Sequence, residues 1–462
     1  MNVFSRRGAC PALSAPMQTG DGLLVRLNPV AGGLTPKSLI GLCESALRHG
    51  NGIMEVTARG NLQIRGLTAE SARLLAAEVD ALGVAVRSGV PVETGPLAGV
   101  DPDEIADPRP LAERIRAAID EAGLTAKLGP KVSVVVDGGG QLTMDAVTAD
   151  VRLKAVRAAA GIQWNVSVAG DARSAKSLAT VDADAARDIT VGAVRMVAEK
   201  GRASHTRDLS ERQLNSLASW HSVTPPSVLP DKSISPLAEE MSGRTEGGAK
   251  ERPPTGSPIG IFDLTDSHAL GIALPYGSMP AQNLIVLATE ASELGTTEIR
   301  LAPGRALLFL DLSASSSLQS SAATLGFVTA ASDPRTRIAA CPGTPACASG
   351  HVATRAIAET IAAESADLLD ASLTLHISGC AKGCAHPGSA ALTLVGDENG
   401  AGLVVDGTAK ALPAGYRPGY DAARGIGGIL AAVRAQRHQG ETAAACLARL
   451  GAAGIAELYR RN

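Results

Sequence analysis

The chain has 462 residues, of which 45% are hydrophobic and 19% are charged, and its formal net charge is −3 at pH 7. This composition is typical of a folded globular protein, and the length is sufficient for two to four domains. A negative net charge and an aromatic content of 2% exclude the positive field and the stacking surfaces on which nucleic-acid binding depends.

No segment of the sequence has the roughly 18 consecutive apolar residues of a membrane-spanning helix. Arg6 and Arg7 are not followed by an apolar stretch, which argues against a secretory or twin-arginine signal. We therefore expect a cytoplasmic protein that binds no membrane, in a compartment where thiols stay reduced.

Two stretches, one in each half of the chain, predict the same order of strand, helix, strand, turn and strand. In the first, Thr35 is an N-cap with Pro36 at the first helical position, and Gly50 ends the helix. In the second, Pro280 starts the helix and Gly295 ends it. Apolar residues recur along the two helices at Leu39, Cys43, Leu47, Leu284, Leu287 and Leu294. We interpret this similarity as a duplication, and two unrelated copies of a common motif are the alternative.

The two copies differ in the hairpin that follows the helix. The first reads R-x-N-x-Q-x-R, with Arg59, Asn61, Gln63 and Arg65 in alternation, whereas the second keeps only Arg305. Because alternating residues of a strand share one face, we expect two guanidinium groups and two amides in a row. Such a face is suited to several carboxylates, which guanidinium groups bind in bidentate fashion. A polar strand face exposed to solvent is the alternative.

A helix and further strands follow each copy. In the first half, Leu111, Ile115 and Ile119 recur at the spacing of an amphipathic helix, and a hairpin is predicted to turn at residues 137–140. Lys131 precedes this hairpin, in a loop that we take to be related to a cysteine-bearing loop of the second half. An ordinary exposed lysine is the alternative.

Residues 222–257 are rich in Pro, Gly, Ser and charged residues and show no hydrophobic periodicity. A segment of this composition cannot bury enough apolar surface to fold by itself. We therefore predict a linker between two halves of similar length.

Four cysteines in the last third of the chain give the sharpest indication of its chemistry. Cys341 and Cys347 form a C-x5-C pair, and Cys380 and Cys384 form a C-x3-C pair. Thiolates bind iron–sulfur clusters, zinc or copper, and a five-residue spacer departs from the usual zinc pairs. We predict an iron–sulfur cluster; zinc and unliganded cysteines are the alternatives. Both pairs are expected on loops, because the elements predicted around them are a helix at 349–364 and strands at 373–378 and 390–396.

Disulfides are not expected, because seven cysteines in 462 residues do not resemble the dense framework of a short secreted chain. Cys43 and Cys446 fit apolar faces of helices, where a buried thiol is inert.

Together these motifs resemble the sulfite/nitrite reductase superfamily of sirohaem and 4Fe–4S proteins. The segments that carry the resemblance are RRGACPALSAPMQTGDGLLVRL, ARGNLQIRGL, LGPKVSVVVDGGG, CPGTPACASGHVATRA and HISGCAKGCAHP. Within the superfamily the chain is most similar to the precorrin-3B synthase family of aerobic cobalamin biosynthesis. The resemblance implies an α+β fold with duplicated ferredoxin-like halves and two mixed α/β cofactor-binding domains, related by a pseudo-two-fold axis.

The implied domains are a first ferredoxin-like half at 1–80, a cysteine-free α/β domain at 81–221, the linker at 222–257, a second ferredoxin-like half at 258–325, and a cluster-binding α/β domain with C-terminal helices at 326–462.

The resemblance also implies roles for individual residues. Cys341, Cys347, Cys380 and Cys384 would ligate a 4Fe–4S cluster, with Cys384 the candidate bridge to a second iron. The R-x-N-x-Q-x-R residues would hold tetrapyrrole carboxylates. Lys131 matches the first lysine of the reductases' anion-binding segment, in which the second lysine is here replaced by Ser133.

The implied reaction is the oxidation of precorrin-3A by O2, with electrons from NAD(P)H through a donor protein or reductase. It hydroxylates the meso carbon C20 and closes the ring A acetate as a γ-lactone. The second iron would be in sirohaem or in a mononuclear non-haem centre, for which His386, and less so His376 and His351, are candidates. An assimilatory sulfite or nitrite reductase and a zinc-stapled, non-catalytic tetrapyrrole-binding protein are the alternatives.

Overall fold

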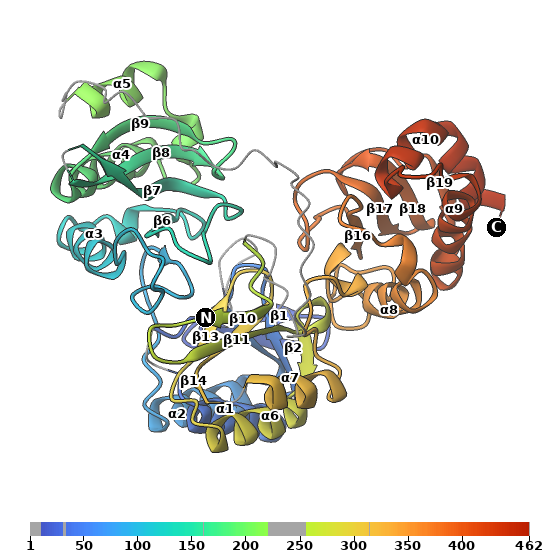
Figure 1. The fold of residues 1–462 in the computed structure, drawn as a ribbon, viewed down its shortest axis with the longest axis horizontal. Helices are drawn as coiled ribbons and strands as arrows, with labels where there is room; N and C mark the ends of the chain where they lie inside the picture. Colours follow the sequence, from blue (N-terminus) through green and yellow to red (C-terminus); the bar gives the residue numbers. More distant parts are fainter. Residues whose placement is uncertain (1–10, 31–33, 160, 220–255, 314, 462) are drawn as a thin grey trace, which may run out of the picture. The chain divides into compact units, whose positions relative to one another are not determined.

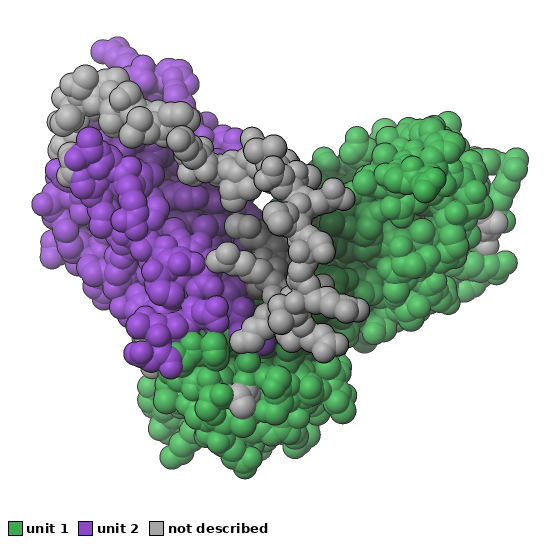
Figure 2. All heavy atoms as spheres, in the orientation of Figure 1, with its two compact units in different colours: residues 1–87, 258–260, 267–462 green, residues 88–257, 261–266 purple. Residues whose placement is uncertain are grey.

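The structure is a computed structural model that describes residues 11–30, 34–159, 161–219, 256–313 and 315–461. The chain forms two compact units, which Figure 2 shows in different colours. Unit 1 contains residues 1–87, 258–260 and 267–462, and unit 2 contains residues 88–257 and 261–266.

The predicted linker at 222–257 lies outside the described residues except for its last two positions. Within the described part of the chain, no helix combines the length and the apolar character needed to cross a bilayer.

Unit 1 contains two copies of the βαββ arrangement (Figure 1). The first consists of β1 (Met17–Thr19), β2 (Gly22–Leu27), α1 (Pro36–His49), β3 (Ile53–Val56), β4 (Leu62–Leu67) and α2 (Ala69–Ala81). The second consists of β10 (Gly260–Asp263), β11 (His268–Ala273), β12 (Ser278–Pro280), α6 (Ala281–Glu293), β13 (Ile299–Ala302), β14 (Ala306–Leu312) and α7 (Ser315–Thr324). Residues 261–263 of β10 are counted with unit 2. The sheet orders are β1-β2-β4-β3-β12 and β10-β11-β14-β13. The predicted duplication of this order is confirmed.

Helix α1 forms as its caps predict. The Thr35 hydroxyl accepts a hydrogen bond from the Ser38 amide at 3.1 Å, and Gly50 is the C-cap. Of the apolar residues that recur along this helix, Leu39 and Cys43 are buried, whereas Leu47 is 46% exposed. Eight positions along a helix of 3.6 residues per turn rotate a side chain by about 80°, which carries Leu47 out of the apolar stripe that Leu39 begins.

Reciprocal hydrogen bonds join the two copies about an approximate two-fold axis. The Ile299 amide, at the start of β13, donates to the Leu34 carbonyl ahead of α1 at 2.8 Å. The Ala281 amide, at the start of α6, donates to the Gly52 carbonyl ahead of β3 at 2.8 Å. Each copy therefore links the start of its helix to the start of the equivalent strand of the other copy.

A third sheet completes unit 1, and the orange to red part of Figure 1 shows it with its helices. Its order is β15-β16-β17-β18-β19, in which the first three strands are parallel and the remaining pairings are antiparallel. The elements are β15 (Ile338–Ala340), α8 (Thr354–Glu364), β16 (Leu375–Ser378), β17 (Ala390–Asp397), β18 (Gly400–Gly407), β19 (Gly415–Arg417), α9 (Ala422–Gln436) and α10 (Ala443–Arg461). The helix and strands predicted around the cysteines are confirmed.

Unit 2 repeats this topology without cysteines. Its sheet order is β5-β6-β7-β8-β9, again with three parallel strands followed by antiparallel pairings. The elements are β5 (Val92–Thr94), α3 (Arg109–Glu121), β6 (Val134–Asp137), β7 (Ala149–Ala158), β8 (Gly161–Gly170), β9 (Lys176–Val181), α4 (Ala183–Lys200) and α5 (Glu211–Ser219). Leu111, Ile115 and Ile119 of α3 are buried in its core, as predicted.

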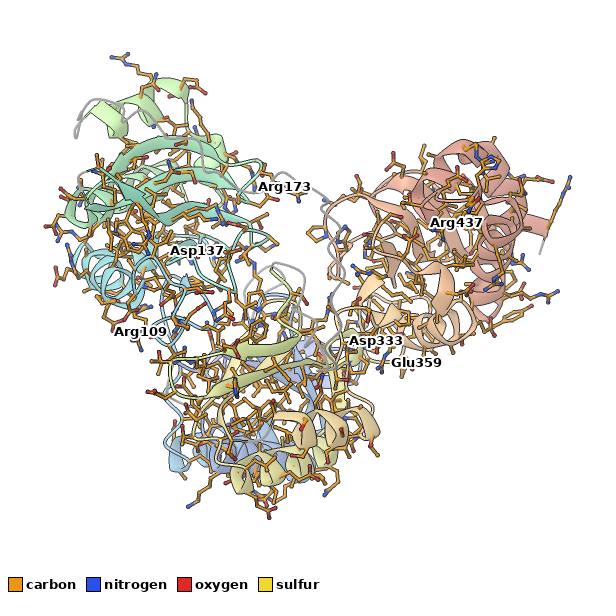
Figure 3. The ribbon with its side chains drawn as sticks, viewed as in Figure 1. Arg109, Asp137, Arg173, Asp333, Glu359 and Arg437 are labelled. Atoms are coloured by element: carbon orange, nitrogen blue, oxygen red, sulfur yellow. The ribbon has the colours of Figure 1, made fainter. Side chains whose placement is uncertain are left out.

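The hairpin predicted to turn at residues 137–140 is wrong, because β6 and β7 run parallel. Asp137, labelled in Figure 3, ends β6, and its carboxylate accepts hydrogen bonds from the Gly139 amide at 2.9 Å and the Met144 amide at 2.8 Å. The buried carboxylate thus stabilises a loop that leads into a parallel strand. The sequence had predicted a tight hairpin turn at this place.

The position of α3 in the core can be tested by making the same Ile→Ala change at a buried and at an exposed position of unit 2. Ile115 is fully buried, whereas Ile162 on β8 is 50% exposed. Ile115→Ala should lower the free energy of unfolding by about 2–5 kcal/mol, and Ile162→Ala by less than about 1 kcal/mol. Urea denaturation of both variants measures the difference, and equal effects would contradict the described core.

Candidate metal centre

The two cysteine pairs meet because the strands before them are parallel neighbours. Cys341 directly follows β15 and Cys380 follows β16 by two residues. The two strands pair in parallel, with Ala340 opposite Ile377, and the Cys341 amide donates to the Ile377 carbonyl at 3.3 Å. Since the carboxyl ends of adjacent parallel strands lie at one sheet edge, both loops start at the same place.

Three glycines let the two loops touch. A Cβ on Gly379, in the second loop, would lie 3.2 Å from the Cα of Gly343 and 3.3 Å from the Cα of Gly350, both in the first loop. A Cβ on Gly350 would lie 2.8 Å from the carbonyl carbon of Gly343. Any larger residue at these positions would force the loops apart, so the glycines set the separation of the cysteine pairs.

Backbone hydrogen bonds then fix the first loop. The Cys347 amide donates to the Gly343 carbonyl at 2.7 Å, and the Gly350 amide donates to the Cys347 carbonyl at 2.9 Å. The His351 amide donates to the Gly379 carbonyl at 2.9 Å, which ties this loop to the second one. Both cysteine pairs therefore lie on ordered backbone.

One thiol already has a hydrogen-bond donor. The Gly379 amide donates to the sulfur of Cys341 at 3.1 Å, and Cys341 is buried. Such N–H···S contacts stabilise a thiolate and tune the potential of a cluster bound to it.

The four thiols lie within electrostatic reach of one another. Loss of solvent around its sulfur raises the pKa of the Cys384 thiol, although the residue as a whole is exposed. The neighbouring Cys380, Cys341 and Cys347 raise this pKa further, and Lys382 lowers it. Four thiolates would therefore repel one another in the protein alone. Metal cations remove this repulsion because they stabilise coordinated thiolates.

The two loops carry four thiols, none of which forms a disulfide among the described residues. Among the same residues, no three His, Cys, Asp or Glu side chains are placed to hold a single metal ion. A 4Fe–4S cluster is held by four cysteine thiolates, one at each iron. Four mutually repelling thiols on two packed loops have the donor chemistry of that group.

The R-x-N-x-Q-x-R row is only partly a strand. Gln63 and Arg65 lie on β4 and are buried, but Arg59 is exposed in the β3–β4 turn and Asn61 precedes the strand. Gly60 enters the left-handed region at φ 73° and reverses the chain there. The prediction that all four side chains share one strand face is therefore wrong for Arg59 and Asn61.

Arg65 binds protein acceptors on several sides. Its guanidinium donates to Asp21 at 3.0 and 3.1 Å and to Glu55 at 3.3 Å. It also donates to the carbonyl of Ala346, the residue before Cys347. The sequence did not predict this contact between the first ferredoxin-like half and the first cysteine loop.

Glu55 extends the network to helix α8. This carboxylate is 3% exposed, and the Arg355 guanidinium also donates to it. Arg355 in turn donates to the Ser278 hydroxyl of β12 at 3.1 Å. The buried charges thus join the two βαββ copies to the helix that follows the first cysteine pair.

Arg305 makes the corresponding contact from the second copy. Its guanidinium donates at 3.1 Å to the carbonyl of Ala385, the residue after Cys384. The sequence contained one indication of this contact, namely that Arg305 is the residue of the second copy that corresponds to the polar row of the first.

The histidines near the second pair differ in exposure. His376 on β16 is fully buried, and neither ring nitrogen has a hydrogen-bond partner among the described residues. Burial, His386 and Arg305 lower the pKa of His376 to about 4, so its ring is neutral at pH 7. His386 packs edge-on against it at 5.7 Å between centroids and donates from Nε2 to the Ser389 carbonyl at 3.0 Å. His351 is exposed.

Lys131 belongs to unit 2 and is exposed ahead of β6. The cysteine loops follow the carboxyl ends of their strands, so Lys131 lies at the opposite end of the equivalent strand. The prediction that it lies in a loop related to a cysteine loop is therefore wrong, because Lys131 precedes β6 whereas the cysteine loops follow β15 and β16. Ser133 is buried, and its amide donates to the Asp150 carboxylate at 3.1 Å.

In unit 2, the loops that follow the first two parallel strands carry carboxylates and no cysteines. Asp101, after β5, accepts hydrogen bonds from the Gln141 amide at 2.7 Å and from the Gln141 side chain at 3.0 Å. Glu104 accepts a hydrogen bond from the Gly99 amide at 2.8 Å. The bonds between Asp101 and Gln141 join the loops that follow β5 and β6, whereas the bond of Glu104 lies within the first of these loops.

Residues 15–82 match the family described as the nitrite/sulfite reductase ferredoxin-like half domain. The chain is 40% identical over 463 residues to a precorrin-3B synthase from a Sinorhizobium species, covering 99% of this chain and 95% of the relative. It is 23% identical to a ferredoxin–nitrite reductase from Synechococcus elongatus, covering 87% of this chain and 82% of that one.

The structure of the Mycobacterium tuberculosis NirA protein is similar to this one, with a TM-score of 0.68 and 20% identity. The match covers 92% of this chain and 83% of that chain. The fold class predicted from the sequence is confirmed.

The environment of Glu104 in unit 2 predicts how the stability of the protein depends on pH. Burial raises the pKa of Glu104 from 4.5 to about 7, and Asp107 and Asp101 add to the effect. Between these two values Glu104 binds a proton more readily in the folded than in the unfolded state, so its contribution to the free energy of unfolding falls as the pH rises from about 4.5 to about 7. Denaturation of Glu104→Gln over this range should show a smaller fall than the wild-type protein does. Parallel profiles of the two proteins would contradict the assignment.

Proposed function

The chain belongs to the precorrin-3B synthase family of enzymes, and on that premise we propose that it converts precorrin-3A to precorrin-3B. One oxygen atom of O2 becomes the hydroxyl at C20, and the ring A acetate closes as a γ-lactone. The other oxygen atom leaves as water, with two electrons and two protons supplied from NAD(P)H through a donor protein or reductase. We place this chemistry in the cytoplasm, where thiols stay reduced.

One observation supports the proposal in addition to family membership. Two loops that pack through glycines at one sheet edge hold four thiols, which would repel one another as thiolates. We assign Cys341, Cys347, Cys380 and Cys384 as the ligands of a 4Fe–4S cluster, which supplies one-electron transfer when bound. The Gly379 amide donates a hydrogen bond to the sulfur of Cys341.

The substrate carries several carboxylates, and arginine suits them through bidentate hydrogen bonds. Arg59 and Asn61 are the members of the polar row that lie outside the buried strand. We therefore assign substrate contact to this turn first. Gln63 and Arg65 support it from β4, where Arg65 is anchored by Asp21.

The proposal includes a second iron, in sirohaem or in a mononuclear non-haem centre. Cys384 is the exposed cysteine of the four, which suits a residue shared with a second group. His386 remains a candidate ligand, because its Nδ1 is not engaged by the bond that Nε2 makes to Ser389. The catalytic role of Lys131 also remains a prediction.

A sulfite or nitrite reductase is the second candidate, favoured by the Synechococcus relative. Ser133 is evidence against a sulfite or nitrite reductase, because it occupies the position of the reductases' second lysine. This position is 2% exposed here.

Anaerobic purification and turnover test the proposal. The wild-type protein should contain sulfide and a small excess of iron over sulfide, because the second iron adds to the 1:1 ratio of the cluster, and it should show a broad absorbance near about 400 nm. It should add one oxygen atom to precorrin-3A only when O2 and a reductant are both present. Mass spectrometry of the product measures this.

Cys380→Ser should lose the cluster and reduce turnover by more than about 100-fold, since even residues behind metal ligands typically contribute 10–100-fold. Cys446→Ser, a matched change at a fully buried helical thiol, should keep its iron. One zinc per chain without sulfide would refute the cluster. Reduction of sulfite or nitrite without oxidation of precorrin-3A would favour the second candidate.

A further inference from the structure

Each ferredoxin-like half sends one arginine to a carbonyl beside a cysteine. Arg65 of the first half donates to Ala346, next to Cys347, and Arg305 of the second half donates to Ala385, next to Cys384. The two halves therefore each hold one cysteine loop, in keeping with the reciprocal bonds between them.

The charges of the two arginines are balanced differently. Arg65 is paired with Asp21 and Glu55. Arg305 has no carboxylate partner within the described part of the chain, and the Ala385 carbonyl is its acceptor. Burial and the nearby cation of Arg355 lower the pKa of Arg305, whereas Arg355 itself is paired with Glu55. A partly buried cation with no counter-ion is unfavourable unless an anion faces it.

The fold maintains Arg305 in an unfavourable backbone conformation. Its φ is 67°, in the left-handed region that residues other than glycine seldom adopt. Its carbonyl accepts a hydrogen bond from the Leu274 amide at 3.0 Å, which fixes the hairpin tip. A Cβ on Gly277 would lie 2.9 Å from its Cδ, so this glycine makes room for the side chain. Strain of this kind is typical of positions that serve a function.

We propose that Arg305 is the counter-charge of the thiolate-bound cluster and raises its reduction potential, whereas Arg65 only positions the first cysteine loop. The inference rests on the proposed cluster. A cluster bound by four thiolates is an anion, and a nearby cation shielded from water stabilises its more negative, reduced form. Arg305 is thus a positioning and charge-balancing residue, which receives no electron itself.

Lys382 is the other cation near the second pair. It lies between Cys380 and Cys384 and donates to the Ser349 hydroxyl at 2.8 Å, so it also bridges the two loops. It is exposed, so solvent and salt screen its charge. Its removal should therefore affect the cluster less than the removal of Arg305 does.

Redox titration of the anaerobic holoprotein, followed by EPR, tests the proposal. Arg305→Gln should shift the midpoint potential to more negative values, and Arg305→Lys should stay close to wild type. Lys382→Gln should give a smaller shift than Arg305→Gln. Arg65→Lys should lower the iron content, while the clusters that remain keep the wild-type potential.

An unchanged potential in Arg305→Gln would overturn the inference. So would a wild-type potential combined with a raised KM for precorrin-3A, which would make Arg305 a site for a substrate carboxylate. If Arg305→Gln assembles no cluster, Arg305→Lys provides the test. A cluster with the wild-type potential in Arg305→Lys would support the charge-balancing role, and loss of the cluster in that variant would refute it. A wild-type protein without iron and sulfide would instead refute the proposed function.

Discussion

The candidate site depends on one constraint, the parallel pairing of β15 with β16. Two strands that end at the same sheet edge deliver two loops to one place, and glycines at Gly343, Gly350 and Gly379 let the backbones touch. Everything else at the site follows from this contact. It fixes the separation of the thiols, lets the Gly379 amide reach Cys341, and leaves the loop carbonyls within reach of arginines from the ferredoxin-like halves.

Unit 2 has the same topology, but its loops carry no cysteines. There the equivalent loops are closed by carboxylates, with Asp101 and Asp137 accepting backbone amides. Hydrogen bonds to a buried carboxylate are strong enough to order a loop without metal. We infer that duplication provided two equivalent loop pairs. In one pair, carboxylates hold the loops through backbone amides, and the other pair carries the four thiols.

Local features of the fold were predictable from the sequence, and contacts between distant residues were not. Thr35 and Gly50 signalled the ends of α1 because caps act within a few residues. The row from Arg59 to Arg65 was misread, since alternation alone does not reveal the turn that Gly60 makes. The hairpin prediction failed because strand direction is set by the whole sheet. The contact of Arg305 joins residues 80 positions apart, which no local pattern encodes.

The central claim is that the four cysteines surround one iron–sulfur cluster held from both ferredoxin-like halves. Anomalous diffraction at the iron absorption edge, from crystals grown without oxygen, tests it most directly. The account predicts one compact iron peak bounded by the sulfurs of all four cysteines, with Arg305 still bound to the Ala385 carbonyl. A single metal ion held by fewer of these cysteines, or iron bound only elsewhere, would contradict it.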